Sequence, residues 1–155
     1  MQHPRARLVF VLHDHQPTGN FDSVFRSATD VCYEPILGAL ERHPHVKVGR
    51  HTSGPLLEWF ENHRPELIGR IRGLAERGRL EIVGGAWSEP MLSVLPDRDA
   101  VGQIRVMRHE CVRLFGRVPR GMWLAERVWE PDLPRVLQAA GVQWVLLDDP
   151  HFRYA

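Results

Sequence analysis

The 155-residue chain lacks the features of a basic nucleic-acid binder or a disulfide-built protein. Lys47 is its only lysine, the formal net charge is +1, and the arginines are dispersed along segments with helical patterns. Dispersed charge of this size argues against a nucleic-acid partner. The two cysteines, Cys32 and Cys111, lie far apart and in no Cys-x-x-Cys pair. Their helix-like surroundings favour two buried free thiols over a disulfide.

Long apolar runs are also missing. No run approaches the roughly 20 residues that span a bilayer, so we expect no membrane partner. The apolar run over 8–12 is shorter than the roughly 7–15 residues of a signal-peptide core, and no small-residue cleavage site follows it. A cytoplasmic protein is the simplest expectation.

The sequence also lacks the motifs of nucleotide binding and of several kinds of covalent catalysis. The sequence contains no phosphate-binding loop, no Gly-x-Ser-x-Gly elbow and no lysine placed for a Schiff base. We therefore expect no cofactor.

The chain does have a regular alternation of short apolar segments and helical patterns. The clearest helix is expected between Asp97 or Asp99 and Gly116, with an apolar stripe at Ala100, Ile104, Met107, Cys111 and Leu114. Other helices are expected from Asp22, with a break near Pro35, from Pro65 to Gly78 and from Pro131 to Gly141. Strands are expected at 7–13, 46–50, 80–83, 121–126 and 142–147. This alternation predicts an α/β fold with a parallel sheet.

Length bears on which parallel architecture is present. A (β/α) barrel usually takes about 250 residues. The chain has enough for five βα units, with no helix expected after the fifth strand. We interpret it as part of a larger barrel, with a complete five-stranded open sheet as the alternative. In both architectures the loops after the strands carry the site.

Polar residues gather at these strand ends. His13 and His15 follow the first strand, and alternation puts both on one side, where two imidazoles can bind a metal or a substrate hydroxyl. Glu81 lies inside an apolar strand, where a carboxylate is costly unless it is paired or functional. Glu89, directly before Pro90, is interpreted as a solvated loop carboxylate.

Two further carboxylate groups follow later strands. Glu126 ends the fourth strand, close to Trp123 and Trp129, whose faces can stack on sugar rings. Residue types alone favour a structural ion pair between Glu126 and Arg127 over a catalytic role. The pair at 148–149, Asp148 and Asp149, can share a proton, bind a metal or cap a helix, and a cap or loop role is favoured.

Taken together, these motifs resemble glycoside hydrolase family 57. The resemblance rests on HDHQP at 13–17, GRLEIVGG at 78–85 with SEP at 88–90, and WLAERVW at 123–129. The stretch VLLDDPHF at 145–152 is similar to the glucanotransferase-like members. The resemblance implies an incomplete (β/α)7 barrel, of which residues 1–155 form the N-terminal part of a single catalytic domain, truncated at the C-terminus.

The resemblance also implies an activity and a site. Family members include α-amylases and 4-α-glucanotransferases, so the expected partner is an α-glucan or maltooligosaccharide. Glu126 would be the nucleophile of a retaining mechanism, and the substrate would be held by His13, His15, Glu81 and Trp123. No metal is implied. The acid/base aspartate is expected beyond residue 155, in the missing C-terminal part of the barrel, so this chain alone is expected to be inactive.

Two other functions stay open at this point. One is a metal-dependent barrel hydrolase of the amidohydrolase or deacetylase kind, with His13 and His15 as ligands and Asp148 or Asp149 adding an oxygen. The other is a non-catalytic carbohydrate-binding remnant.

Overall fold

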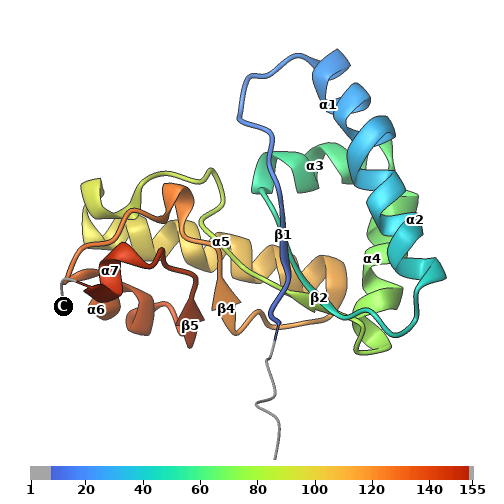
Figure 1. The fold of residues 1–155 in the computed structure, drawn as a ribbon. Coiled ribbons are helices and arrows are strands. Elements are labelled where there is room, and N and C mark those ends of the chain that lie inside the picture. The colour runs from blue at the N-terminus through green and yellow to red at the C-terminus, as the bar shows by residue number, and fades with distance from the viewer. Residues whose placement is uncertain (1–7, 154–155) are drawn as a thin grey trace, which may run out of the picture.

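The computed structural model describes residues 8–153 as an α/β arrangement of parallel strands and helices (Figure 1). Two predictions from the sequence fall partly outside the described residues. One is the strand over 7–13, whose first residue lies outside them. The other is the N-terminal segment that was compared with a signal peptide, most of which lies outside them. Among helices in the described part, none is both long and apolar enough for a membrane crossing.

The strands follow one another in space in the order in which they occur in the chain. Three of them form one parallel sheet and two form another, and a parallel bridge between Gly84 and Met122 joins the two sheets. The strands are β1 (Val11–Asp14), β2 (Val48–Thr52), β3 (Leu80–Ile82), β4 (Gly121–Met122) and β5 (Trp144–Val145). A doubly wound open sheet reverses its strand order at a switch point. The unbroken order of the described strands is instead that of a barrel wall.

Helices connect the strands. Those that follow β1 and β2 lie on one side of the molecule in Figure 1, and those that follow β4 and β5 lie on the other. The helices are α1 (Asp22–Ala28), α2 (Glu34–Arg42), α3 (Gly54–His63), α4 (Pro65–Glu76), α5 (Asp97–Phe115), α6 (Leu133–Ala139) and α7 (Pro150–Arg153). Short turns complete them: the π-helical η1 (Thr29–Tyr33) and the 3-10 turns η2 (Leu92–Val94) and η3 (Ala125–Arg127).

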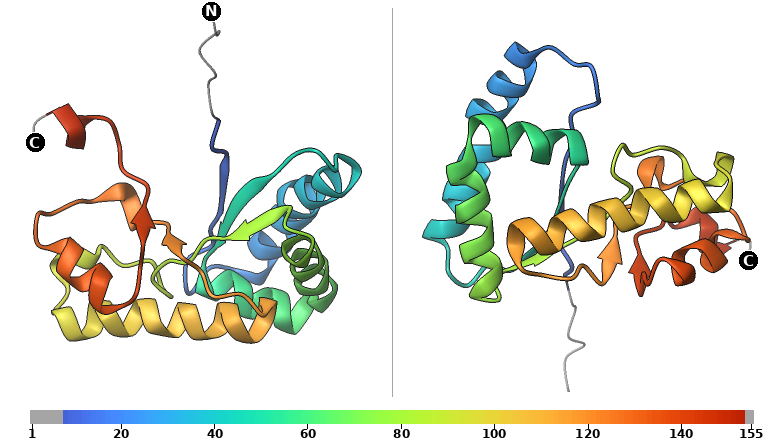
Figure 2. Two further views of the ribbon diagram at one scale, coloured as in Figure 1. Left: turned by 90° about the horizontal axis from the view of Figure 1, so that it is seen from below. Right: turned by 180° about the vertical axis from the view of Figure 1, so that it is seen from behind.

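Helix α5 holds the two halves together. It runs beneath both groups of strands in the left view of Figure 2 and packs against α4 at one end and α6 at the other. Its predicted apolar stripe is buried throughout. Ala100 and Ile104 belong to the core cluster around β4 and α6, whereas Met107, Cys111 and Leu114 belong to the cluster around α2, α3 and α4. The helix ends as predicted at Gly116, whose φ of 64° is left-handed.

The strand ends differ from the sequence-based prediction. β2 extends to Thr52, so His51, expected in a loop, lies in the strand and is completely buried. β4 stops at Met122, four residues earlier than predicted, and the chain turns through η3. An apolar run predicts that a strand exists, but the last ladder hydrogen bond depends on the neighbouring strand. The chain also forms α7 after β5, where no helix was expected.

The two cysteines are free thiols in different surroundings. Cys111 is buried, as expected, but Cys32 is exposed in η1, so its predicted burial is wrong. The prediction assumed a regular helix with 3.6 residues per turn, in which Cys32 lies on the buried apolar stripe. The π-helical turn before Pro35 has more residues per turn, so Cys32 leaves that stripe and faces solvent.

We therefore expect only one thiol to react in the folded protein. Cys32 reacts with a water-soluble aromatic disulfide within minutes, whereas Cys111 reacts only after unfolding, because burial raises its thiol pKa to about 12 and blocks access. The absorbance of the aromatic thiolate that is released reports the reaction of each cysteine. Cys32→Ser is the control, and it should remove the reaction that is seen before unfolding. Equal reactivity of both thiols would contradict the packing of α5.

Candidate active site

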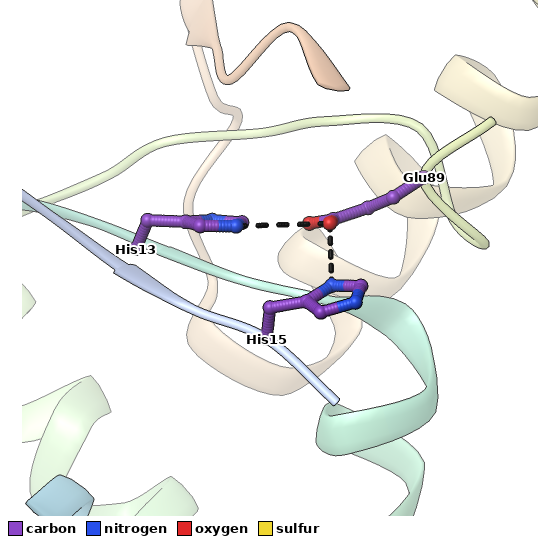
Figure 3. A group of neighbouring side chains, drawn as sticks. All are labelled: His13, His15 and Glu89. Carbon is purple, nitrogen blue, oxygen red and sulfur yellow. Dashed lines mark ion pairs between the residues drawn. The ribbon is translucent and has the colours of Figure 1, made fainter. Parts of the chain in front are cut away.

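Four side chains meet where β1 and β2 end. The parallel register sets His13 opposite His51, and alternation places His15 on the side of His13, as predicted. Glu89 reaches the three histidines from the loop after β3. Figure 3 shows the Glu89 side chain pointing at His13 and His15 from this loop. We call these four residues the histidine–glutamate cluster.

Glu89 contacts all three imidazoles. Its Oε2 lies 2.5 Å from His15 Nδ1 and 3.7 Å from His13 Nε2, and its Oε1 lies 3.3 Å from His51 Nδ1. Only 8% of its side chain is exposed. The interpretation of Glu89 as a solvated loop carboxylate is therefore wrong. Its backbone is left-handed, with φ of 52°, whereas a residue before proline is normally extended, so the sequence offers no signal for this turn.

Burial favours the neutral forms of these groups. It raises the pKa of Glu89 to about 8, helped by the neighbouring Glu126 carboxylate. Burial also lowers the pKa of His13 to about 4, with the His15 and Arg127 charges adding to the effect, and lowers those of His15 and His51. At neutral pH the cluster thus presents a carboxylic acid and neutral imidazoles. Such groups both donate and accept hydrogen bonds, as sugar hydroxyls require.

The His13 ring is fixed from two sides. Its Nδ1 shares a hydrogen bond with His51 Nδ1 at 2.9 Å. The indole of Trp123, which follows β4, stacks on the same ring with centroids 4.1 Å apart and an interplanar angle of 12°. The structure therefore brings Trp123 to His13, beside the position predicted for a sugar.

Glu126 lies exposed in η3, next to this cluster. The ion pair that residue types favoured for it does not form, because Arg127 Nε pairs with Asp148 Oδ1 at 2.6 Å. The Arg127 guanidinium also lies over the Trp123 ring, with Cζ 5.5 Å from its centroid. Within residues 8–153, Glu126 makes no ion pair, so its carboxylate is available for other partners.

Backbone strain concentrates at this place. Glu89, Glu126 and Arg127 are the non-glycine residues with positive φ in the described part of the chain, at 52°, 52° and 51°. Each such residue costs about 1–3 kcal/mol and persists where the surroundings enforce it, typically at functional sites. Glu89 contacts the three histidines, and Glu126 is close enough for its charge to act on the pKa of Glu89 and of His15.

Glu81 is not brought to this cluster. It stands opposite Gly49 in the register, whereas His13 stands opposite His51, two residues further along β2. Its side chain is 45% exposed, and its carboxylate pairs with Arg120 at 3.7 Å. A carboxylate inside a three-residue strand can therefore reach solvent at the end of the strand away from the histidines.

The remaining predicted residues have structural contacts. Asp148 pairs with Arg127 instead of meeting the histidines as the metal-hydrolase alternative required. The carbonyls of Asp148 and Asp149 accept hydrogen bonds from the first turn of α7. Trp129 is partly buried and packs against the core cluster around α6.

The amino-acid sequence of the chain matches a known protein family. The model of Glycosyl hydrolase family 57 matches residues 9–155. The chain belongs to glycosyl hydrolase family 57. The family model covers all three motifs from which the resemblance was drawn, and this membership does not favour the metal-hydrolase alternative.

Named family 57 relatives are similar along the same stretch. The alpha-amylase of Pyrococcus furiosus is 45% identical over 97% of this chain, and the 4-alpha-glucanotransferase of Thermococcus kodakarensis is 45% identical over 97%. The crystal structure of 4-alpha-glucanotransferase from Thermococcus litoralis superimposes with a TM-score of 0.92 at 43% identity over 95% of this chain. The chain spans about 23% of the length of each.

The role of Asp148 in this family 57 chain can be tested directly. An exposed ion pair is worth up to about 1 kcal/mol, so Asp148→Asn in the full-length protein should lower kcat/KM by no more than about fivefold. Asp149→Asn is the matched control, expected to stay within about twofold. Steady-state kinetics measures both, and a loss above about 1,000-fold in Asp148→Asn would make it a catalytic carboxylate.

Proposed function

We propose that this chain forms the nucleophile side of a retaining enzyme that acts on α-1,4-glucans by hydrolysis or glucanosyl transfer. Family 57 membership, and 45% identity to proteins named alpha-amylase and 4-alpha-glucanotransferase, support the substrate class. One observation carries the assignment of the site. Glu126, held in a left-handed turn after β4, is an exposed carboxylate beside a buried cluster of neutral hydrogen-bonding groups.

In this proposal Glu126 attacks the anomeric carbon and forms a glycosyl-enzyme. A nucleophile must be an ionised carboxylate with a free oxygen. The contacts of Arg127 suit this role, because its charge is tied to Asp148 and its guanidinium lies on Trp123. The left-handed turn fixes the direction in which Glu126 leaves the backbone, so little conformational freedom is lost when the sugar binds.

The histidine–glutamate cluster and Trp123 hold the sugar. His15 is the most exposed of the three histidines, with 39% of its side chain accessible, and His13 is 25% exposed. Both can therefore reach sugar hydroxyls from the strand end. His51 is fully buried and acts by orienting His13. In this proposal Glu89 takes the substrate-binding role that the family resemblance implied for Glu81.

A retaining mechanism needs a second carboxyl group about 5–5.5 Å from the nucleophile to protonate the leaving oxygen. Glu89 does not suit that role, because both of its oxygens face the histidines. We infer that the acid/base comes from outside residues 1–155 and that it then activates water or a glucan hydroxyl. The isolated chain should therefore show no turnover.

The stereochemical outcome tests this function. Proton NMR of the full-length protein acting on a maltooligosaccharide should show the α-anomer of the new reducing end first, followed by mutarotation. Chromatography of the products then separates hydrolysis from transfer, which lengthens part of the substrate. A β-anomer formed first would overturn the retaining mechanism, and no turnover of any α-glucan would overturn the substrate class.

A further inference from the structure

Three atoms of the histidine–glutamate cluster form a set of metal-ligand type. His13 Nε2, His15 Nδ1 and Glu89 Oε2 belong to a group whose ligand atoms all lie within 4.8 Å of one another. We propose that these three side chains bind a zinc-class divalent cation, and that the bound cation excludes the glucan. The cation is an inhibitor in this proposal and takes no part in the reaction.

Two of the three separations between ligand atoms are close to what zinc requires, and the third is within 4.8 Å. Bonds of about 2.0–2.1 Å in a tetrahedral site place ligand atoms about 3.3–3.4 Å apart. The gap between His13 Nε2 and Glu89 Oε2 is 3.7 Å, and that between His15 Nδ1 and Glu89 Oε2 is 2.5 Å. The second gap must widen by less than about 1 Å. His15 can supply this movement, because 39% of its side chain is exposed and it closes the cluster on the solvent side.

The surroundings already hold the ligands as metal sites do. A ligating histidine usually has its other ring nitrogen in a hydrogen bond that fixes the ring. His13 meets this condition, since its Nδ1 lies 2.9 Å from Nδ1 of the fully buried His51 and its ring stacks on Trp123. Three protein ligands leave a fourth position open, which is the arrangement of an accessible zinc site.

A second observation concerns the Glu89 carboxyl group. Glu89 is more than nine-tenths buried, yet its Oε1 makes no hydrogen bond to any described residue. A buried carboxyl oxygen without a donor is costly. A cation at Oε2 would take the place of the Glu89 proton and stabilise the carboxylate that remains. Two imidazole nitrogens with one carboxylate oxygen select zinc or a similar transition metal over calcium or magnesium, which take oxygen ligands.

The inhibitory part rests on the proposed function, because the same side chains are assigned to the sugar. A cation on His13, His15 and Glu89 removes the groups that would bind hydroxyls. It should therefore raise the apparent KM for maltooligosaccharides while leaving kcat unchanged.

Cobalt titration of the full-length protein tests the site without reference to activity. We expect one equivalent of Co²⁺ to give the strong visible bands of four- or five-coordinate cobalt, and Zn²⁺ to displace it. His15→Gln and Glu89→Gln should each weaken binding at least tenfold. His15→Gln is the variant least able to disturb folding, since His15 is the most exposed ligand. His109→Gln, with a 78% exposed side chain on α5, is the control and should bind as the parent does.

The outcomes separate the two proposals. Parent-like cobalt binding in His15→Gln, or the weak bands of six-coordinate cobalt, would overturn the metal site. A site that binds zinc without raising KM would overturn the exclusion of glucan by the metal. If the protein turned over no α-glucan, the proposed function would fail, and the cobalt titration would still decide the metal site.

Discussion

Glu126→Gln in the full-length protein should lower turnover of maltooligosaccharides by at least about 1,000-fold. The amide cannot form the glycosyl-enzyme, because it is a far weaker nucleophile than a carboxylate. Glucan affinity should stay within about threefold, since the proposed sugar-binding groups, His13, His15 and Glu89, keep their contacts. Steady-state kinetics and calorimetric binding of a maltooligosaccharide measure the two effects separately.

The matched control is Glu130→Gln, an exposed glutamate in the same loop after β4. It should keep kcat within about twofold. The melting temperature of Glu126→Gln should equal that of the parent. Glutamine has the shape of glutamate, and the backbone strain of the positive φ at this position is the same for both residues. A Glu126→Gln enzyme with a rate within tenfold of the parent would show that the nucleophile is another residue.

The second large effect concerns stability. Arg50→Met should reduce the free energy of unfolding by about 3–5 kcal/mol, because it leaves a carboxylate buried without its partner. Arg50 Nε lies 2.5 Å from Asp14 Oδ2, and the two side chains are 2% and 5% exposed. Thr52 Oγ1, at 3.4 Å, is too weak a donor to replace the guanidinium. Urea unfolding followed by circular dichroism measures the loss.

Two further variants identify the cause. Arg26→Met removes an exposed pair with Asp22, in which both side chains are 55% exposed, and should cost at most about 1 kcal/mol. The double variant of Asp14→Leu with Arg50→Met should recover most of the loss, because an apolar pair needs no compensating charge. A double variant as unstable as Arg50→Met alone would assign the effect to packing instead of the buried charge.

This pair also matters to the site. Asp14 lies between His13 and His15 in the chain, and alternation turns its side chain to the opposite face of β1. The Asp14–Arg50 contact thus ties β1 to β2 on one face while the histidines meet Glu89 on the other. Variants at Arg50 should therefore weaken glucan binding as well as folding.

Much of this fold follows from patterns in the sequence. The stripe on α5 predicted its buried face and its end at Gly116, because helix period and a left-handed cap residue are local properties. Alternation likewise predicted that His13 and His15 share a face. These inferences need no knowledge of which segments become neighbours.

The parts that could not be predicted depend on contacts between distant segments. Glu89 enters the cluster through a left-handed turn before Pro90, which no local preference signals. His51 joins it through the register of β1 with β2, set by the whole sheet. The family resemblance implied a site role for Glu81, but its level along β3 places its side chain with Arg120 and away from the histidines.

Covalent labelling tests the central assignment most directly. A fluorinated α-glucosyl fluoride forms the glycosyl-enzyme of a retaining glucan-acting enzyme faster than water removes it, so the intermediate accumulates. The Glu126 carboxylate displaces the anomeric fluoride, so mass spectrometry of peptides from the labelled full-length protein should find one fluoroglucosyl group, on Glu126. Attachment to Glu89, to Asp148 or to a carboxylate outside this chain would contradict the account of the site.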